Sequence, residues 1–123
     1  MNVSKKKVTS SLPVNVATEV VIDSQGIIRY PSNGLVFEYS KLSKLLLSTI
    51  SLTLEEKMDI LRSLHKLTET QRKKLEKVLD TELEKLENID RKNPGYLKDI
   101  RNENVSALSS VEGFTIRIKD FAK

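Results

Sequence analysis

Cysteine is absent from the 123 residues of this chain, and its absence excludes several kinds of chemistry. The chain can form no disulfide, hold no thiolate metal site and offer no cysteine nucleophile. Small secreted domains usually depend on disulfides for their stability. The sequence therefore favours a cytoplasmic or otherwise intracellular setting, or a place in virion assembly.

Histidine occurs once, as His65, and the four glycines stand alone in the sequence. A helical metal or acid–base site needs partners three or four residues away, and Glu69, the one such carboxylate, lies beyond a predicted helix break. Neither a glycine-rich phosphate loop nor a G-x-S-x-G motif is present. Carboxylates between residues 76 and 87 share one helical side but lack the Glu-x-x-His pattern of carboxylate-bridged metal bundles. We therefore expect a non-enzymatic protein without metal or cofactor.

Long apolar runs are also missing, since none approaches the roughly eighteen residues that a membrane span requires. Residues 1–11 are polar and basic, without the apolar stretch of a signal peptide. These features predict a soluble protein with no membrane partner. Aromatic residues make up only 5% of the chain, so the core of this single small domain should consist mainly of Leu, Ile and Val.

The net charge is +4, and its distribution is uneven. Residues 53–92 hold ten basic and ten acidic side chains, whereas Lys5, Lys6 and Lys7 stand together in a predicted flexible tail, residues 1–12. A basic cluster can contact nucleic-acid phosphates. Nucleic-acid binding is accordingly the main alternative to a protein partner.

Residues 13–39 predict an antiparallel β-meander. Valine and isoleucine gather in three short runs, 14–22, 27–30 and 35–39. Two turn signals separate them, Asp23-Ser-Gln-Gly26 and Pro31-Ser-Asn-Gly34.

The first of these turns also carries a family resemblance. Residues 21–31, with Asp23, Gly26, Ile28 and Pro31 in register, resemble the opening hairpin of AbrB-like swapped-hairpin DNA-binding domains, whose pattern runs Asp-x-x-Gly-Arg-Ile-x-x-Pro. The chain departs from that pattern at Ile27 and after the proline. The resemblance implies a dimer that places basic hairpin residues on DNA, with Arg29 as the candidate inside the match.

Helices are expected next, a short buried one over 40–51 and an antiparallel helical hairpin over 53–92. Capping boxes, Thr53-x-x-Glu56 and Thr68-x-x-Gln71, open two runs with helical apolar periodicity. The stop signal Asn93-Pro-Gly95 closes the second run.

The second helix of this hairpin is longer than the first can cover, so Leu83, Leu86 and Ile89 need another partner. Glu82 lies in the middle of the same apolar stripe, where an unpaired carboxylate is costly. We expect the side chain of Lys57 or the Thr53 cap to pair with the Glu82 carboxylate. Another chain could instead cover the stripe, which makes these four positions the candidate partner-binding residues.

The C-terminal segment, 93–123, is predicted to hold one helical turn within 96–104 and a half-buried strand over 114–118, which alternates strictly between apolar and polar residues. This strand should return to the N-terminal sheet. The chain as a whole is therefore predicted to be a single α+β domain.

The sequence best supports contact with other proteins as the function. We expect an adaptor or a small structural subunit of a larger assembly, a homo-oligomer included, with the helical hairpin as its surface. The alternative is a nucleic-acid-binding protein that uses Lys5, Lys6, Lys7 and Arg29.

Overall fold

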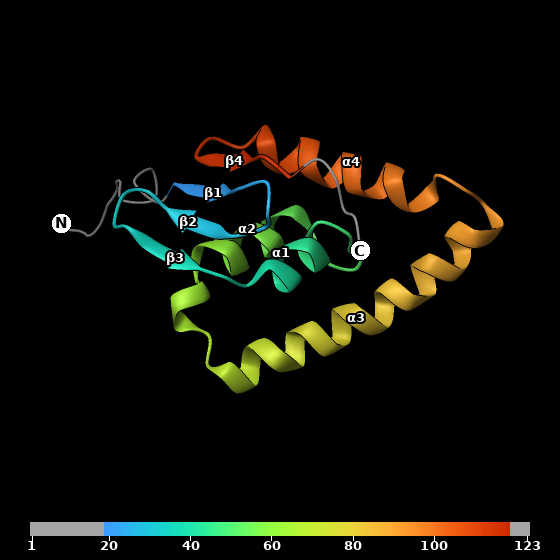
Figure 1. Ribbon diagram of the computed structural model, residues 1–123, viewed down its shortest axis with the longest axis horizontal. Helices are drawn as coiled ribbons and strands as arrows, with labels where there is room; N and C mark the ends of the chain where they lie inside the picture. The colour runs from blue at the N-terminus through green and yellow to red at the C-terminus, as the bar shows by residue number, and fades with distance from the viewer. Residues whose placement is uncertain (1–18, 119–123) are drawn as a thin grey trace.

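A computed structural model describes residues 19–118 and has an α+β fold with a four-stranded mixed sheet (Figure 1). The elements, in chain order, are β1 (Val20–Ile22), β2 (Ile28–Tyr30), β3 (Leu35–Phe37), α1 (Ser40–Leu46), α2 (Leu54–Arg62), the 3-10 turn η2 (Leu64–Lys66), α3 (Glu69–Lys92), α4 (Tyr96–Ser109) and β4 (Phe114–Ile116). The predicted fold class, with its N-terminal meander and returning C-terminal strand, is confirmed.

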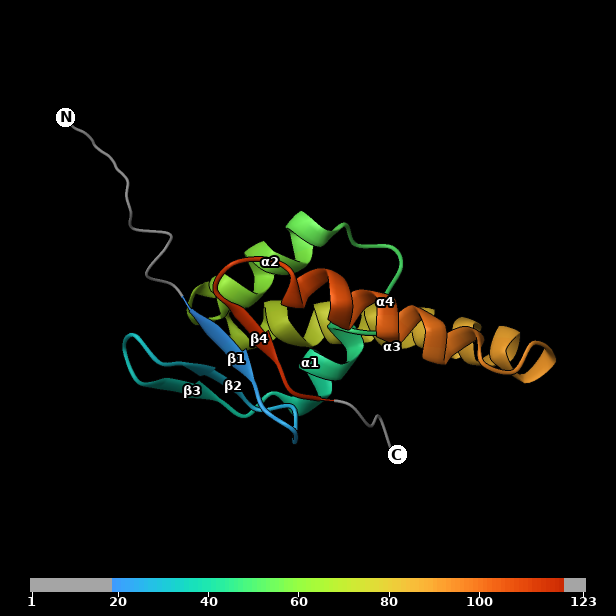
Figure 2. The ribbon, with the colours of Figure 1, turned by 90° about the horizontal axis from the view of Figure 1, so that it is seen from above.

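The sheet has the strand order β3-β2-β1-β4. The first three strands pair antiparallel as a meander, and β4 lies parallel to β1, with Val20 opposite Phe114. Alternate residues of β1 and β2 are buried, as expected when one face of a sheet is covered. The helices provide this cover, and Figures 1 and 2 show α2 and α4 beside β1 and β4.

The turn between β1 and β2 holds the first helix in place. Gly26 has a φ of 88°, a conformation that glycine adopts without steric cost. Its carbonyl accepts a hydrogen bond from the Ser43 hydroxyl at 2.6 Å. A Cβ at position 26 would lie only 3.0 Å from that Ser43 oxygen. Glycine is therefore required here both by its backbone and by the close approach of α1.

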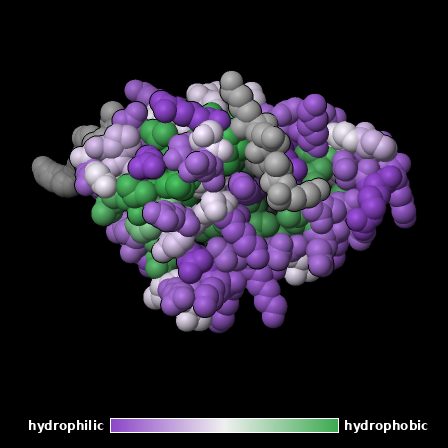
Figure 3. Space-filling model, viewed as in Figure 1, coloured by the Kyte–Doolittle hydropathy of each residue, from purple (hydrophilic) through white to green (hydrophobic). Residues whose placement is uncertain are grey.

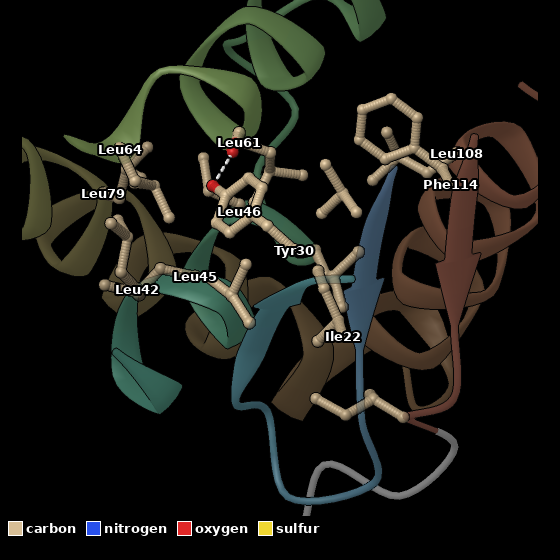
Figure 4. Close-up of a cluster of buried hydrophobic side chains, with 14 residues drawn as sticks. Ile22, Tyr30, Leu42, Leu45, Leu46, Leu61, Leu64, Leu79, Leu108 and Phe114 are labelled. Carbon is tan, nitrogen blue, oxygen red and sulfur yellow. Dashed lines mark hydrogen bonds between the residues drawn. The ribbon is translucent and has the colours of Figure 1, made fainter. Parts of the chain in front are cut away.

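The main core lies between the sheet and the first three helices, where leucines of α1, α2 and α3 meet residues of β1 and β2 (Figure 4). Tyr30 reaches from β2 through this core, and its hydroxyl donates a hydrogen bond to the Leu61 carbonyl. Burial raises the pKa of the Tyr30 hydroxyl above its ordinary value of 10.0. The hydroxyl therefore stays protonated and continues to donate.

Helix α1 ends at Leu46, five residues before the predicted end of the 40–51 helix. The chain then continues as a loop in which Ser48 and Thr49 are buried. The Ser48 hydroxyl donates to the Lys44 carbonyl at 2.9 Å, and short hydroxylated side chains that bond the backbone compete with helix propagation. We call residues 47–51 the 47–51 loop.

Both predicted capping boxes are present, at Thr53 for α2 and at Thr68 for α3. The long α3 packs mainly on α1 and α4, whereas α2 packs on α4. Only one helical turn was predicted after Gly95, and that prediction is wrong, because α4 runs for 14 residues. Figure 1 shows α4 returning beside the C-terminal half of α3 toward the sheet.

Candidate contact surface along α3

Glu82 of α3 holds the 47–51 loop by its carboxylate. One oxygen, Oε2, accepts the backbone N–H groups of Ile50 and Ser51, each at 3.1 Å. The other, Oε1, accepts the Thr49 hydroxyl and the Ser51 hydroxyl. The predicted partners of Glu82, Lys57 and the Thr53 cap, are therefore not the groups that bond it. The carboxylate instead supplies acceptors that the loop backbone lacks.

Asn104 of α4 binds the same loop from the other side. Its Nδ2 donates to the carbonyls of Leu47 and Thr49 at 2.8 and 3.0 Å. Its Oδ1 accepts from the Lys57 ammonium group at 2.7 Å. Lys57 is only 4% exposed, and this burial lowers the pKa of its ammonium group, although the nearby Glu82 carboxylate opposes the shift. Side chains of α3 and α4 therefore bond the loop directly, and Lys57 of α2 bonds Asn104.

The chain itself covers most of the apolar stripe that was predicted to bind a partner. Leu86 is 3% exposed and packs with Leu97 and Ile100 of α4. Leu83 is half-buried between this cluster and the main core. Ile89, near the end of α3, is 42% exposed. Of the candidate residues Glu82, Leu83, Leu86 and Ile89, only Ile89 presents a largely uncovered side chain.

A different flank of α3 carries the most exposed apolar residue of the part of the chain that the structure describes. Val78 is 64% exposed, and Ile50 of the 47–51 loop, whose backbone N–H donates to Glu82, is 58% exposed. An open groove of about 470 Å³ runs along this flank. Its lining residues are Ser51, Lys77, Val78, Thr81, Glu82 and Lys85. We call this feature the α3 groove.

Two lysines, Lys77 and Lys85, border the α3 groove, and neither forms an ion pair with any residue between 19 and 118. They are eight residues apart, about 12 Å along a helix. Two other lysines of this region do form ion pairs, Lys73 with Glu69 at 3.2 Å and Lys41 with Asp80 at 3.5 Å, whereas Lys74 forms none within residues 19–118. Figure 3 shows hydrophilic side chains along α3 on the face it views. The groove therefore combines an apolar floor with a basic border.

The residues of the nucleic-acid alternative are not brought together by the described structure. Lys5, Lys6 and Lys7 lie outside residues 19–118. Arg29 projects from β2, and its Nε lies 3.3 Å from the Asp23 carboxylate. Backbone N–H groups of Gln25 and Ile27 also bond this carboxylate. Arg29 therefore has a structural partner within its own hairpin.

Within residues 19–118 there is no group of three or more His, Asp or Glu side chains arranged to hold a metal ion. His65 lies exposed in the 3-10 turn η2. No helix of that same range is long and apolar enough to cross a membrane.

Comparisons with known proteins identify no relative of this chain. No family model, no curated protein and no solved structure matches the chain. The resemblance of residues 21–31 to AbrB-like hairpins therefore has no support from a family match.

The sequence did not predict the α3 groove, although two signals were present. Val78 is an apolar residue that a helical projection places at the edge of the arc centred on Leu79 and Leu86. Lys77 and Lys85 had no acidic residue four positions away with which to pair. The groove also needs Ser51, which lines it together with residues of α3. The sequence does not show that the loop conformation brings Ser51 beside this helix.

Proposed function

We propose that this protein is a non-enzymatic contact module, a small structural subunit or adaptor, that binds another protein chain through the α3 groove. The observation that carries the proposal is Val78, a β-branched residue left 64% exposed on a helix between two lysines without ion-pair partners. β-Branched residues are poor helix formers. Neither helix stability nor core packing accounts for Val78.

The surroundings of Val78 support a binding role. Glu82 fixes the backbone of Ile50, so this second exposed apolar side chain is held in place before any partner arrives. A pre-ordered surface loses less conformational entropy on binding than a flexible one. Apolar side chains inside a charged border are also the usual composition of a protein contact site.

Affinity purification with paired variants tests this proposal. The tagged chain and its Lys77→Glu/Lys85→Glu variant are used to recover partners from an extract of the native source, and the recovered proteins are compared by quantitative mass spectrometry. We expect the variant to lose the specific partners, because like charges now face the acidic groups that the lysines attract.

A matched control separates this effect from a general change of charge. The Lys66→Glu/Lys92→Glu variant changes the net charge by the same amount at exposed positions that do not line the groove. It should recover the same partners as the parent chain. If the groove variant keeps every partner that the control keeps, the α3 groove is not the contact surface.

A further inference from the structure

We infer that the occupant of the α3 groove is the N-terminal part of α2, residues 54–59, from a second copy of this chain, in a reciprocal two-fold contact. This inference rests on the proposed function, because it names the partner of the same groove. It depends on two patches of opposite charge whose nearest residues in the chain, Ser51 and Leu54, are three positions apart.

The first two turns of α2 have the acidic chemistry that the groove lacks. Leu54 is 36% exposed, and Glu55 and Asp59 are exposed beside it. Neither carboxylate forms an ion pair within residues 19–118. Their four-residue spacing places like charges next to each other on the helix, which is unfavourable until a cation approaches. We call Leu54, Glu55 and Asp59 the acidic turn.

The acidic turn is opposite in charge to the border of the α3 groove, and it is short enough to fit between the two lysines. Glu55 and Asp59 span about 6 Å along α2, and the two lysines span about 12 Å along α3. The two carboxylates therefore fit between the two ammonium groups. Leu54 would then lie over Val78, whose side chain is the apolar part of the groove.

The two patches lie close enough together for a reciprocal contact. Ser51 lines the groove and Leu54 begins α2, so they are three positions apart, at most about 11 Å of chain. When complementary patches adjoin on one surface, a two-fold axis places each patch on the opposite patch of the other subunit. Both copies then bury the same residues, and the contact closes without leaving a free groove.

Charge exchange between two variants tests this arrangement. One variant reverses the acidic turn, Glu55→Lys/Asp59→Lys, and the other reverses the groove border, Lys77→Glu/Lys85→Glu. Sedimentation velocity of the full chain at rising concentration measures association, and circular dichroism checks that each variant is folded. We expect the parent chain to dimerise, with weaker association at higher salt.

Each variant alone should dimerise at least about tenfold more weakly, because like charges face each other twice in its dimer. An equal mixture of the two should recover the dimer, because both contacts of the mixed pair again join opposite charges. The Lys66→Glu/Lys92→Glu control should dimerise like the parent chain.

Two results would overturn the inference. One is a parent chain that stays monomeric up to millimolar concentration, and the other is a mixture that associates no better than its components. If the groove variant nevertheless loses a different protein in the affinity experiment, the occupant is an acidic segment of that protein. The proposed function then stands while the second copy is excluded. If neither experiment responds to the groove variant, the proposed function fails as well.

Discussion

The inner side of α3 and the α3 groove differ in whether the chain itself satisfies their side chains. On the inner side, Leu79 and Leu86 are buried and Glu82 binds the 47–51 loop. In the groove, Val78 is exposed and Lys77 has no ion-pair partner within the part of the chain that the structure describes. Packing and hydrogen bonds within the chain account for the residues on the inner side. Lys77 and Val78 of the groove, in contrast, contribute little to the stability of the folded chain.

This difference separates stability from binding in a testable way. Changes on the inner side should lower the free energy of unfolding. Changes at Lys77, Val78 and Lys85 of the groove should leave that free energy nearly unchanged and alter association instead, whereas Glu82, which also lines the groove, contributes to stability through its bonds to the 47–51 loop.

The largest loss is expected for Leu86→Ala. Leu86 packs against Leu97 and Ile100, and α4 cannot close the space that the truncation leaves. Large-to-small changes at such sites cost about 3 kcal/mol. Urea unfolding followed by circular dichroism measures the change. A loss below about 1 kcal/mol would show that α4 does not pack firmly on α3.

Glu82→Gln should cost about 2 kcal/mol, since hydrogen bonds to a charged acceptor are stronger than neutral ones. An amide also presents a donor where the carboxylate receives donors from the 47–51 loop. The matched control is Glu84→Gln, an exposed residue two positions along the same helix. The same unfolding experiment should leave the control unchanged. Equal losses in the two variants would contradict the role given to Glu82.

Lys57 predicts a dependence of stability on pH. Burial lowers the pKa of its ammonium group in the folded protein below the ordinary 10.5. Between the lowered pKa and 10.5 the unfolded chain binds more protons, so the free energy of unfolding rises with pH in that window.

A Lys57→Met variant removes this contribution and keeps every other titratable group of the parent chain. We therefore expect the parent to gain stability relative to the variant as the pH approaches 10.5. Denaturant unfolding over a series of alkaline pH values measures both profiles. Parallel profiles would mean that Lys57 keeps its ordinary pKa.

The smallest effect on stability is expected for Val78→Ala. Alanine is the better helix former, and the exposed valine loses little packing, so stability should stay the same or rise by about 0.5 kcal/mol. The same variant should weaken association through the α3 groove. A loss of stability comparable to that of Leu86→Ala would place Val78 in the core and remove its role in contact.

Local signals made much of the fold predictable. The capping boxes at Thr53 and Thr68 fix helix starts through contacts within four residues, so the sequence displays them directly. The two tight turns at Gly26 and Gly34 likewise depend on neighbouring residues, and both glycines have positive φ. Each of these features is visible without knowledge of the rest of the fold.

Helix α4 was missed because a polar residue interrupts its apolar stripe. Leu97, Ile100 and Leu108 lie on one side of the helix, and Asn104 falls between them on that side. Glu82 interrupts the stripe of α3 in the same way. Both polar residues face the 47–51 loop, whose unpaired backbone groups they bond. The sequence alone does not explain either polar residue, because the loop groups that they bond are more than thirty residues away in the chain.

The reciprocal contact between the α3 groove and the acidic turn is tested most directly by amide NMR spectra of the parent chain from micromolar to millimolar concentration. We expect signals of residues 77–85 and of residues 54–59 to shift together with one dissociation constant, and we expect the Lys77→Glu/Lys85→Glu variant to show neither set of shifts. Spectra that do not change with concentration, or shifts confined to other parts of the chain, would contradict it.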